Sequence, residues 1–166
     1  PGVIVADEPV SALDVSIQAQ VLNLLGDLKK RLGLTLVFVT HDLRVVNFFC
    51  DRIAVMYMGR LVELGTRKQI MEESRHPYTR MLLSAAPRDE PGVEIDRPWV
   101  KNELDATAPL GNACNFAARC WARQALGNPE RCMTERPEDH PREDGRVVAC
   151  HFEEQIPALA AAETAR

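Results

Sequence analysis

The stretch of sequence that decides the fold is Val3-Ile4-Val5-Ala6-Asp7-Glu8-Pro9-Val10-Ser11-Ala12-Leu13-Asp14. Its first four residues are apolar and rich in β-branched side chains, which predicts a strand buried on both faces of a parallel sheet. Asp7 and Glu8 follow at the end of this strand, and Pro9 is a poor continuation of it, so a turn is expected there. Because open α/β sheets bind ligands outside the carboxyl ends of their strands, both acids are placed at a ligand-binding edge.

The residues after this turn alternate between helical and strand patterns as far as residue 87. Asp14 or Ser16 can cap a helix whose apolar positions follow helical spacing and which Gly33 ends. The further elements expected are strands at 34–39 and 53–58, a hairpin return at 61–64, and helices at 42–49, 67–73 and from 77 to just before 87. This order predicts an α/β fold with a mainly parallel sheet.

Composition narrows the class of protein. The chain has 166 residues and a net charge of -4, which gives no electrostatic reason to expect a nucleic-acid partner. Its longest apolar runs, such as residues 34–39, are too short to span a bilayer, and no stretch reads as a secretory signal. The first residue is Pro1 and leads directly into a strand, so we expect that an amino-terminal half is missing.

A histidine is expected at the same sheet edge as the two acids, because His41 follows the second strand. A carboxylate there can hold Mg²⁺ and a second can polarise the water that attacks a γ-phosphate. The imidazole can reach that phosphate or orient the water, in either protonation state. An isolated Asp-Glu pair is more often a solvated turn, and a lone histidine is more often structural, so the surrounding residues have to decide.

Those residues carry a resemblance to a known family. Residues 3–8 resemble the Walker B strand of ABC ATPases, residues 11–14 resemble their D-loop, and His41 resembles their switch histidine. Residues 7–20 are similar to the oligopeptide/dipeptide importer branch, and to the second of its two paired ATPase subunits in particular. His76-Pro77-Tyr78-Thr79-Arg80 and the following Leu82-Leu83-Ser84-Ala85 fit the same branch.

The resemblance implies a role for each matching residue. Asp7 would be the carboxylate associated with Mg²⁺, Glu8 the general base or water-polarising group, and His41 the sensor of the γ-phosphate. Ser11 and Asp14 would belong to the loop that communicates across a dimer of ATPase domains, in which each ATP lies between two subunits. The implied fold is part of a P-loop NTPase core of the ABC type.

Three family motifs are absent from the sequence: the G-x-x-x-x-G-K-[ST] phosphate loop, the glutamine loop and the Leu-Ser-Gly-Gly-type signature. The phosphate loop supplies the backbone cradle and the lysine that bind the triphosphate. We therefore expect this chain alone to bind ATP poorly and to hydrolyse it negligibly.

Four of the five cysteines fall in a cysteine-bearing segment, residues 110–153, and are Cys114, Cys120, Cys132 and Cys150. Five, eleven and seventeen residues separate them, which matches neither the C-x₂-C knuckle of zinc sites nor the ferredoxin run. Spacing leaves an Fe–S cluster, zinc and reduced thiols all open. The segment has few large apolar residues, so a thin core in need of a metal staple is expected.

The cysteine-bearing segment is also similar to the irregular carboxy-terminal extension of peptide-importer ATPases. The match lies in residues 114–120, Cys132 and residues 146–152. In that family the four cysteines are associated with a [4Fe–4S] cluster, which is what the resemblance implies here. Residues 1–87 are accordingly expected to be the ATPase part, 88–109 a linker, 110–153 the extension, and 154–166 a disordered tail.

The function expected is that of an ATPase subunit that uses ATP and Mg²⁺ to drive import of peptides or related small solutes. Its expected partners are a second ATPase subunit, membrane permease subunits and, indirectly, an extracytoplasmic solute-binding protein. Its expected place is peripheral, on the cytoplasmic face of a bacterial inner membrane. Two alternatives stay open: a soluble ABC-type ATPase without a transport function, and a non-enzymatic Fe–S or zinc module whose ATPase half is vestigial.

Overall fold

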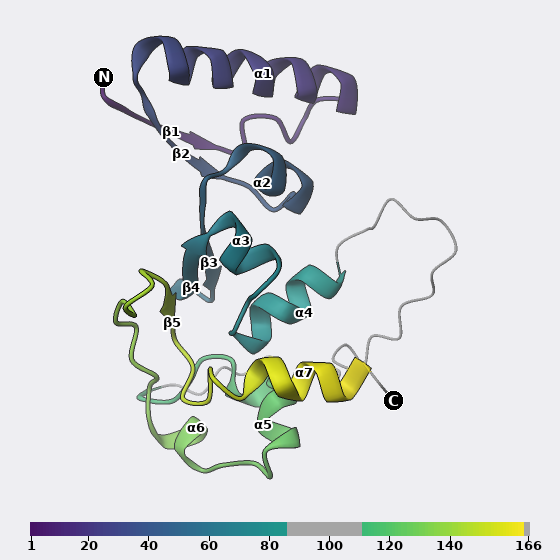
Figure 1. Ribbon diagram of the computed structural model, residues 1–166, viewed down its shortest axis with the longest axis vertical. Helices are drawn as coiled ribbons and strands as arrows, with labels where there is room; N and C mark the ends of the chain where they lie inside the picture. Colours follow the sequence, from purple (N-terminus) through teal and green to yellow (C-terminus); the bar gives the residue numbers. More distant parts are fainter. Residues whose placement is uncertain (86–110, 165–166) are drawn as a thin grey trace. The chain divides into compact units, whose positions relative to one another are not determined.

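The computed structural model describes residues 1–85 and 111–164. The chain divides into two compact units, Pro1–Asp51 and Arg52–Arg166, whose elements are labelled in Figure 1. The predicted linker at 88–109, with the boundaries that flank it, lies outside the described residues.

The first unit contains a pair of parallel strands, β1 (Val3–Asp7) and β2 (Thr35–Val39). The helix α1 (Val15–Leu32) connects them and runs alongside the pair in Figure 1. Asp14 caps this helix by accepting from the Ile17 backbone N–H at 3.0 Å, and Gly33 ends it with a φ of 63°. A second helix, α2 (Leu43–Phe49), begins after the capping residue Asp42. The predicted α/β pattern with parallel strands is confirmed.

The core of the first unit lies on one side of the strand pair. Val10, Leu22 and Val45 are buried together there, with Phe38 of β2 and Phe49 of α2 packed against them. Burying each of these side chains stabilises the fold by roughly 1.5–3 kcal/mol. Both helices therefore cover the same face of the two strands.

The other face of the strand pair differs from the prediction of strands buried on both sides. Its side chains Val3, Val5, Val37 and Val39 are all exposed. Residues alternate between faces along a strand, so the β-branched run provides apolar side chains to both. Within the described residues of this unit only one face is covered, because both helices pack on the side of Phe38.

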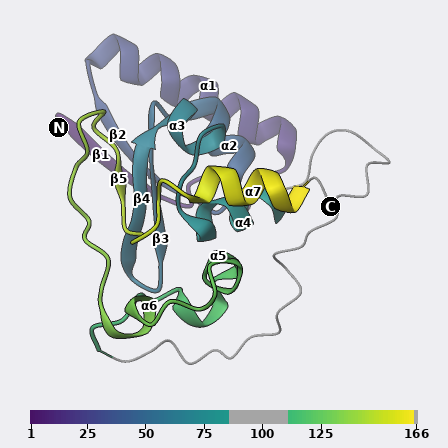
Figure 2. The same cartoon turned by 60° about the horizontal axis from the view of Figure 1, so that its bottom comes forward.

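The second unit is built on an antiparallel hairpin of β3 (Arg52–Tyr57) and β4 (Arg60–Thr66). Met58 and Gly59 form its turn with φ values of 46° and 72°, the left-handed geometry that two-residue hairpins require. A short strand, β5 (Val147–Val148), pairs with β4 and completes a three-stranded sheet, as Figure 2 shows. The predicted hairpin is confirmed. The strand β3 was expected to belong to the parallel sheet. It belongs instead to this separate antiparallel sheet.

Two helices follow the hairpin in sequence. The first, α3 (Arg67–Met71), begins at a capping box in which Thr66 and Gln69 satisfy each other's backbone N–H groups. The second is α4 (Pro77–Ala85), with proline in its first position, where a backbone N–H is not needed.

The cysteine-bearing segment has three short helices around it: α5 (Trp121–Ala125), α6 (Arg131–Thr134) and α7 (Ile156–Thr164). Figure 1 shows α7 lying beside α5. Trp121 and Ala122 of α5 pack against Ile156 and Ala160 of α7. The prediction of a disordered tail from residue 154 was therefore wrong for α7, because Ile156 is completely buried and anchors the helix.

This segment shares its core with the residues that precede it. Phe116 is 1% exposed and lies against Tyr57 and Tyr78, with ring centroids 5.2 and 5.5 Å away. The indole Nε1 of Trp121 donates to the Pro77 carbonyl at 3.1 Å. The prediction of a thin, separate core was wrong, because residues of β3, β4 and α4 contribute to the core of this segment. The thin core therefore no longer supports the need for a metal staple.

Candidate functional site

The ends of β1 and β2 bring together two of the predicted catalytic residues. The Glu8 backbone N–H donates to the Val39 carbonyl at 2.9 Å, which extends the parallel pairing by one residue. Glu8 then has a φ of 43°, an uncommon value for a residue with a side chain, and the chain turns. The Glu8 carboxylate lies 2.8 Å from the Nδ1 atom of His41, which follows β2.

This pair is open to solvent: the side chains of Glu8 and His41 are 48% and 75% exposed. An ionised carboxylate can only accept hydrogen bonds, so Nδ1 of His41 carries the proton that joins the two groups. In a neutral imidazole the Nε2 atom then has a free lone pair, and in an imidazolium it is a second donor. Either form presents one polar nitrogen to a ligand.

The other predicted residues of this edge lie on the same turn or at its ends. Asp7 is the last residue of β1, is exposed, and stands opposite Val39 in the strand register. The Ser11 hydroxyl donates to the Glu8 carbonyl at 3.0 Å and so stabilises the turn. Asp14 is engaged as the helix cap, where hydrogen bonds from the Ser16 hydroxyl and the Ile17 backbone hold the pKa of its carboxyl below the usual value.

All four cysteines of the second unit line one cavity of about 20 Å³, and none of them is in a disulfide. The other polar side chains in its wall are His76, Arg123 and His151, and the rest are apolar. Burial raises the pKa of the Cys120 thiol to about 12 and also raises those of Cys114, Cys132 and Cys150. Without a ligand these thiols are protonated near neutral pH.

Across residues 1–85 and 111–164, no group of three or more Cys, His, Asp or Glu side chains is arranged to hold a metal ion. A four-iron cluster is bound differently, because each of four thiolates holds its own iron atom around a shared core. Four thiols line one cavity that has no carboxylate in its wall, and the Cys120 sulfur accepts the Arg123 backbone N–H at 3.4 Å. At about 20 Å³ this cavity is too small for such a cluster.

A buried polar network beside this cavity was missed by the sequence analysis. Glu63 is 1% exposed and accepts the backbone N–H groups of Arg75 at 2.6 Å and His76 at 3.2 Å. The Nδ1 atom of His76 accepts from the Tyr78 backbone, and the ring also bonds to the Ala149 backbone. The available signal was a glutamate within the apolar strand at 61–64 and a histidine directly before Pro77.

Comparison with known proteins identifies relatives of this chain. The family described as the oligopeptide/dipeptide transporter, C-terminal region, matches residues 62–126. The dipeptide transport ATP-binding protein DppF of Haemophilus influenzae is 46% identical over 150 residues, covering 90% of this chain. The chain belongs to the family of oligopeptide/dipeptide ABC transporter ATP-binding proteins.

Another member of this ABC family, DppF of Escherichia coli strain K12, is also 46% identical, over 155 residues and 93% of this chain. The chain spans 44% and 45% of the lengths of these two relatives, just under half. A solved structure, CbiO1 of Clostridium perfringens, part of the ABC transporter complex CbiONQ, is 36% identical and covers 44% of this chain and 29% of its own, with a TM-score of 0.41. A TM-score this low does not establish a shared fold.

Crossing a membrane requires a long, apolar helix. Within the two described ranges, no helix combines the length and the apolar character that crossing a membrane requires.

Proposed function

We propose that this chain is part of an ATP-hydrolysing subunit that energises the import of peptides or related small solutes through an ABC transporter. The observation that carries the proposal is the 2.8 Å contact between the Glu8 carboxylate and Nδ1 of His41 at the carboxyl ends of two parallel strands. The printed names of the relatives, dipeptide transport ATP-binding proteins, support the same function.

In this proposal each residue of the turn has one task. Glu8 would accept a proton from the attacking water or polarise it, and His41, which contacts the Glu8 carboxylate through Nδ1, would hold it in place and leave Nε2 for the γ-phosphate. Asp7 would be the carboxylate that holds Mg²⁺, and the ion would supply charge neutralisation. Ser11 and Asp14 shape the turn and the start of α1, so that this loop can contact a second ATPase subunit.

The proposed partners are that second subunit, membrane permease subunits and, through them, an extracytoplasmic solute-binding protein. The proposed location is peripheral, on the cytoplasmic face of a bacterial inner membrane. The soluble ABC-type ATPase without a transport function is the alternative that a pull-down with the permease subunits would reveal, because it would recover none of them.

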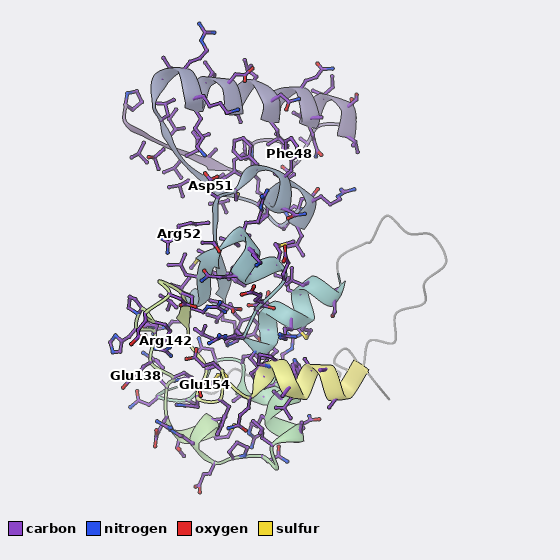
Figure 3. All side chains as sticks on the ribbon, in the orientation of Figure 1. Phe48, Asp51, Arg52, Glu138, Arg142 and Glu154 are labelled. Atoms are coloured by element: carbon purple, nitrogen blue, oxygen red, sulfur yellow. The ribbon has the colours of Figure 1, made fainter. Side chains whose placement is uncertain are left out.

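The test of the ATPase assignment uses the full-length subunit in its complex. The variant Glu8→Gln keeps the shape and a hydrogen-bond acceptor but removes the base, so ATP binding should persist while turnover falls by roughly 10²–10⁴-fold. Glu138→Gln is a matched control, because Glu138 is an exposed glutamate of the second unit, labelled in Figure 3. Unchanged turnover in the Glu8 variant would remove this residue from its proposed role.

We also propose that Cys114, Cys120, Cys132 and Cys150 hold a [4Fe–4S] cluster. Four thiols around one cavity support the proposal. At about 20 Å³ the cavity has room for little more than one water molecule, so binding a cluster requires the surrounding loops to move outward. When bound, the cluster would supply a cross-link and a one-electron redox centre, and the thiols would lose their protons to bind iron.

Metal analysis of the anaerobically purified full-length subunit tests this cofactor. About four irons and four acid-labile sulfides per chain are expected, and both should be lost from Cys114→Ser and Cys132→Ser. Cys50→Ser is the matched control, because Cys50 lies in the first unit, at the end of α2. Zinc without sulfide, or no metal, would overturn the cluster proposal and leave the ATPase proposal untouched.

A further inference from the structure

The turn that contains Glu8 has an uncommon backbone conformation at its first residue. Residues 8–13 form this turn and lead from β1 into α1, as Figure 1 shows, and Glu8 has a φ of 43°. A residue with a Cβ atom keeps this left-handed conformation only where the surrounding structure holds it there. The contacts that hold the turn therefore decide where the Glu8 carboxylate lies.

Three hydrogen bonds act on the backbone of Glu8 itself. Its N–H donates to the Val39 carbonyl at 2.9 Å. Its own carbonyl accepts from the Ser11 hydroxyl at 3.0 Å and from the Ser11 backbone N–H at 3.3 Å. These bonds join the start of the turn to β2 and close it on Ser11, but none of the three attaches the turn to α1.

The attachment to α1 is made through Val10. Its side chain is 3% exposed and packs in the core with Leu22 of α1 and Val45 of α2. Its carbonyl oxygen accepts from the Leu13 backbone N–H at 3.2 Å and from the Nε2 atom of Gln18 at 2.9 Å. The bond from Gln18 is partly buried and spans eight positions, so this amide ties the middle of the turn to the beginning of α1.

We propose that Gln18 is a positioning residue for the Glu8 carboxylate, because its amide holds the Val10 carbonyl and with it the segment that contains Glu8. This inference rests on the ATPase function proposed above, in which Glu8 acts on the attacking water. Gln18 touches no reacting atom in this role. Without its bond, Glu8 keeps its charge and its contact with His41, but the turn is held less firmly against α1.

The experiment compares two substitutions of Gln18 by steady-state ATP hydrolysis, in the full-length subunit within its complex. Gln18→Glu keeps the length of the side chain, but an ionised carboxylate cannot donate to the Val10 carbonyl, whereas the ammonium group of Gln18→Lys can. We expect kcat to fall about tenfold in Gln18→Glu and to stay within about threefold of wild type in Gln18→Lys, because small displacements of a catalytic group are costly. The KM for ATP should change little in either variant, since the expected phosphate-binding loop lies outside this turn.

This pair of variants separates positioning from the stability of the helix. Gln18 lies near the N-terminus of α1, where the helix dipole favours a negative charge and disfavours a positive one. Glu, Gln and Lys have similar intrinsic helix propensities. A role limited to the stability of α1 therefore predicts the opposite order of activities, with Gln18→Glu the more active variant, and that order overturns the proposal.

Gln20→Glu is the matched control, because Gln20 is an exposed glutamine of the same helix. Its kcat should equal that of the wild type, and a loss as large as that of Gln18→Glu would remove the special role of Gln18.

A double-mutant cycle tests whether Gln18 acts through Glu8. Adding Gln18→Glu to Glu8→Gln should lower kcat little further, because the carboxylate that Gln18 positions is already gone. The same loss in both backgrounds contradicts the proposal. The cycle also separates this inference from the proposed function. Wild-type turnover in Glu8→Gln alone overturns the role of Glu8, whereas a loss in Glu8→Gln with none in Gln18→Glu overturns only the role of Gln18.

Discussion

The Nδ1 atom of His41 lies 2.8 Å from the Glu8 carboxylate, although 33 positions separate the two residues in the sequence. The contact exists because β1 and β2 are parallel neighbours whose register pairs Asp7 with Val39. Both strands end at the same edge of the pair. Glu8 directly follows β1 and His41 lies two positions beyond β2, so the two side chains come into contact. The whole helix α1 serves as the connection that makes this possible.

Loss of the imidazole should slow ATP hydrolysis without preventing nucleotide binding. For His41→Ala in the full-length subunit we expect turnover to fall by roughly 10²-fold or more. Glu8 loses its hydrogen-bond partner, and the site loses the Nε2 atom, which donates to the γ-phosphate when the imidazole is protonated. Steady-state phosphate release and nucleotide binding are the two measurements. His140→Ala is the control, since His140 is an exposed histidine of the second unit, and a similar loss in both variants would contradict the assignment.

Acid should destabilise the second unit through His76. This histidine is buried and its pKa is lowered to about 3 from 6.5, chiefly because burial penalises the charged ring. The unfolded chain then binds a proton that the folded chain does not, between about pH 6.5 and pH 3. Stability is therefore complete above pH 6.5 and falls with acid by about 1.4 kcal/mol per pH unit within that window.

The thermal unfolding midpoint of the second unit, measured against pH, checks this expectation. His76→Gln should flatten the profile between pH 6.5 and 5, because the titrating group is gone. Glu63 faces His76 and acts in the opposite sense: burial raises the pKa of its carboxyl above 4.5, so its contribution falls as pH rises. The net slope should thus be reduced just above pH 4.5, where Glu63 opposes His76, and a profile unchanged by His76→Gln would disprove the assignment.

The helix α7 should depend on a single apolar anchor. Ile156 is completely buried and packs with Trp121 and Ala122 of α5. Ile156→Ala should lower the free energy of unfolding of the second unit by about 2–5 kcal/mol through the lost burial and the cavity left behind. Faster hydrogen exchange at residues 156–164 is the accompanying local signal. Glu154→Ala, an exposed position labelled in Figure 3, should leave both measurements unchanged.

The link between α5 and α4 rests partly on one hydrogen bond. The Trp121 indole donates to the Pro77 carbonyl at 3.1 Å in a buried setting. Trp121→Phe keeps an aromatic ring but leaves that carbonyl without this donor, so a loss of about 1–3 kcal/mol is expected. Denaturant unfolding measures it, and the unchanged stability of a control such as Arg131→Gln would show that the effect is local. Equal stability of wild type and Trp121→Phe would mean that water replaces the bond.

Local chemistry allowed several elements to be predicted closely. The strand over residues 3–6, the cap at Asp14, the stop at Gly33 and the turn at Gly59 all depend on the intrinsic preferences of residues within a few positions of each other. The predicted Asp7, Glu8 and His41 were placed at one edge because parallel strands end together, and the structure brings Glu8 and His41 into contact. Their catalytic roles stay predictions that the variants above test.

The tertiary structure alone decided what depends on contacts between distant segments. The antiparallel sheet of β3, β4 and β5 joins residues 85 positions apart, since Glu63 pairs with Val148. The helix α7 is ordered because Ile156 packs against Trp121. The alanine-rich sequence of α7 has no helical pattern of apolar residues that could predict this packing. The motifs at the strand ends could be predicted from the sequence because each depends on residues that are close together in the chain. The size of the cavity that the four cysteines share, and the other residues in its wall, came only from the tertiary structure, because they depend on how separate loops pack around the same point.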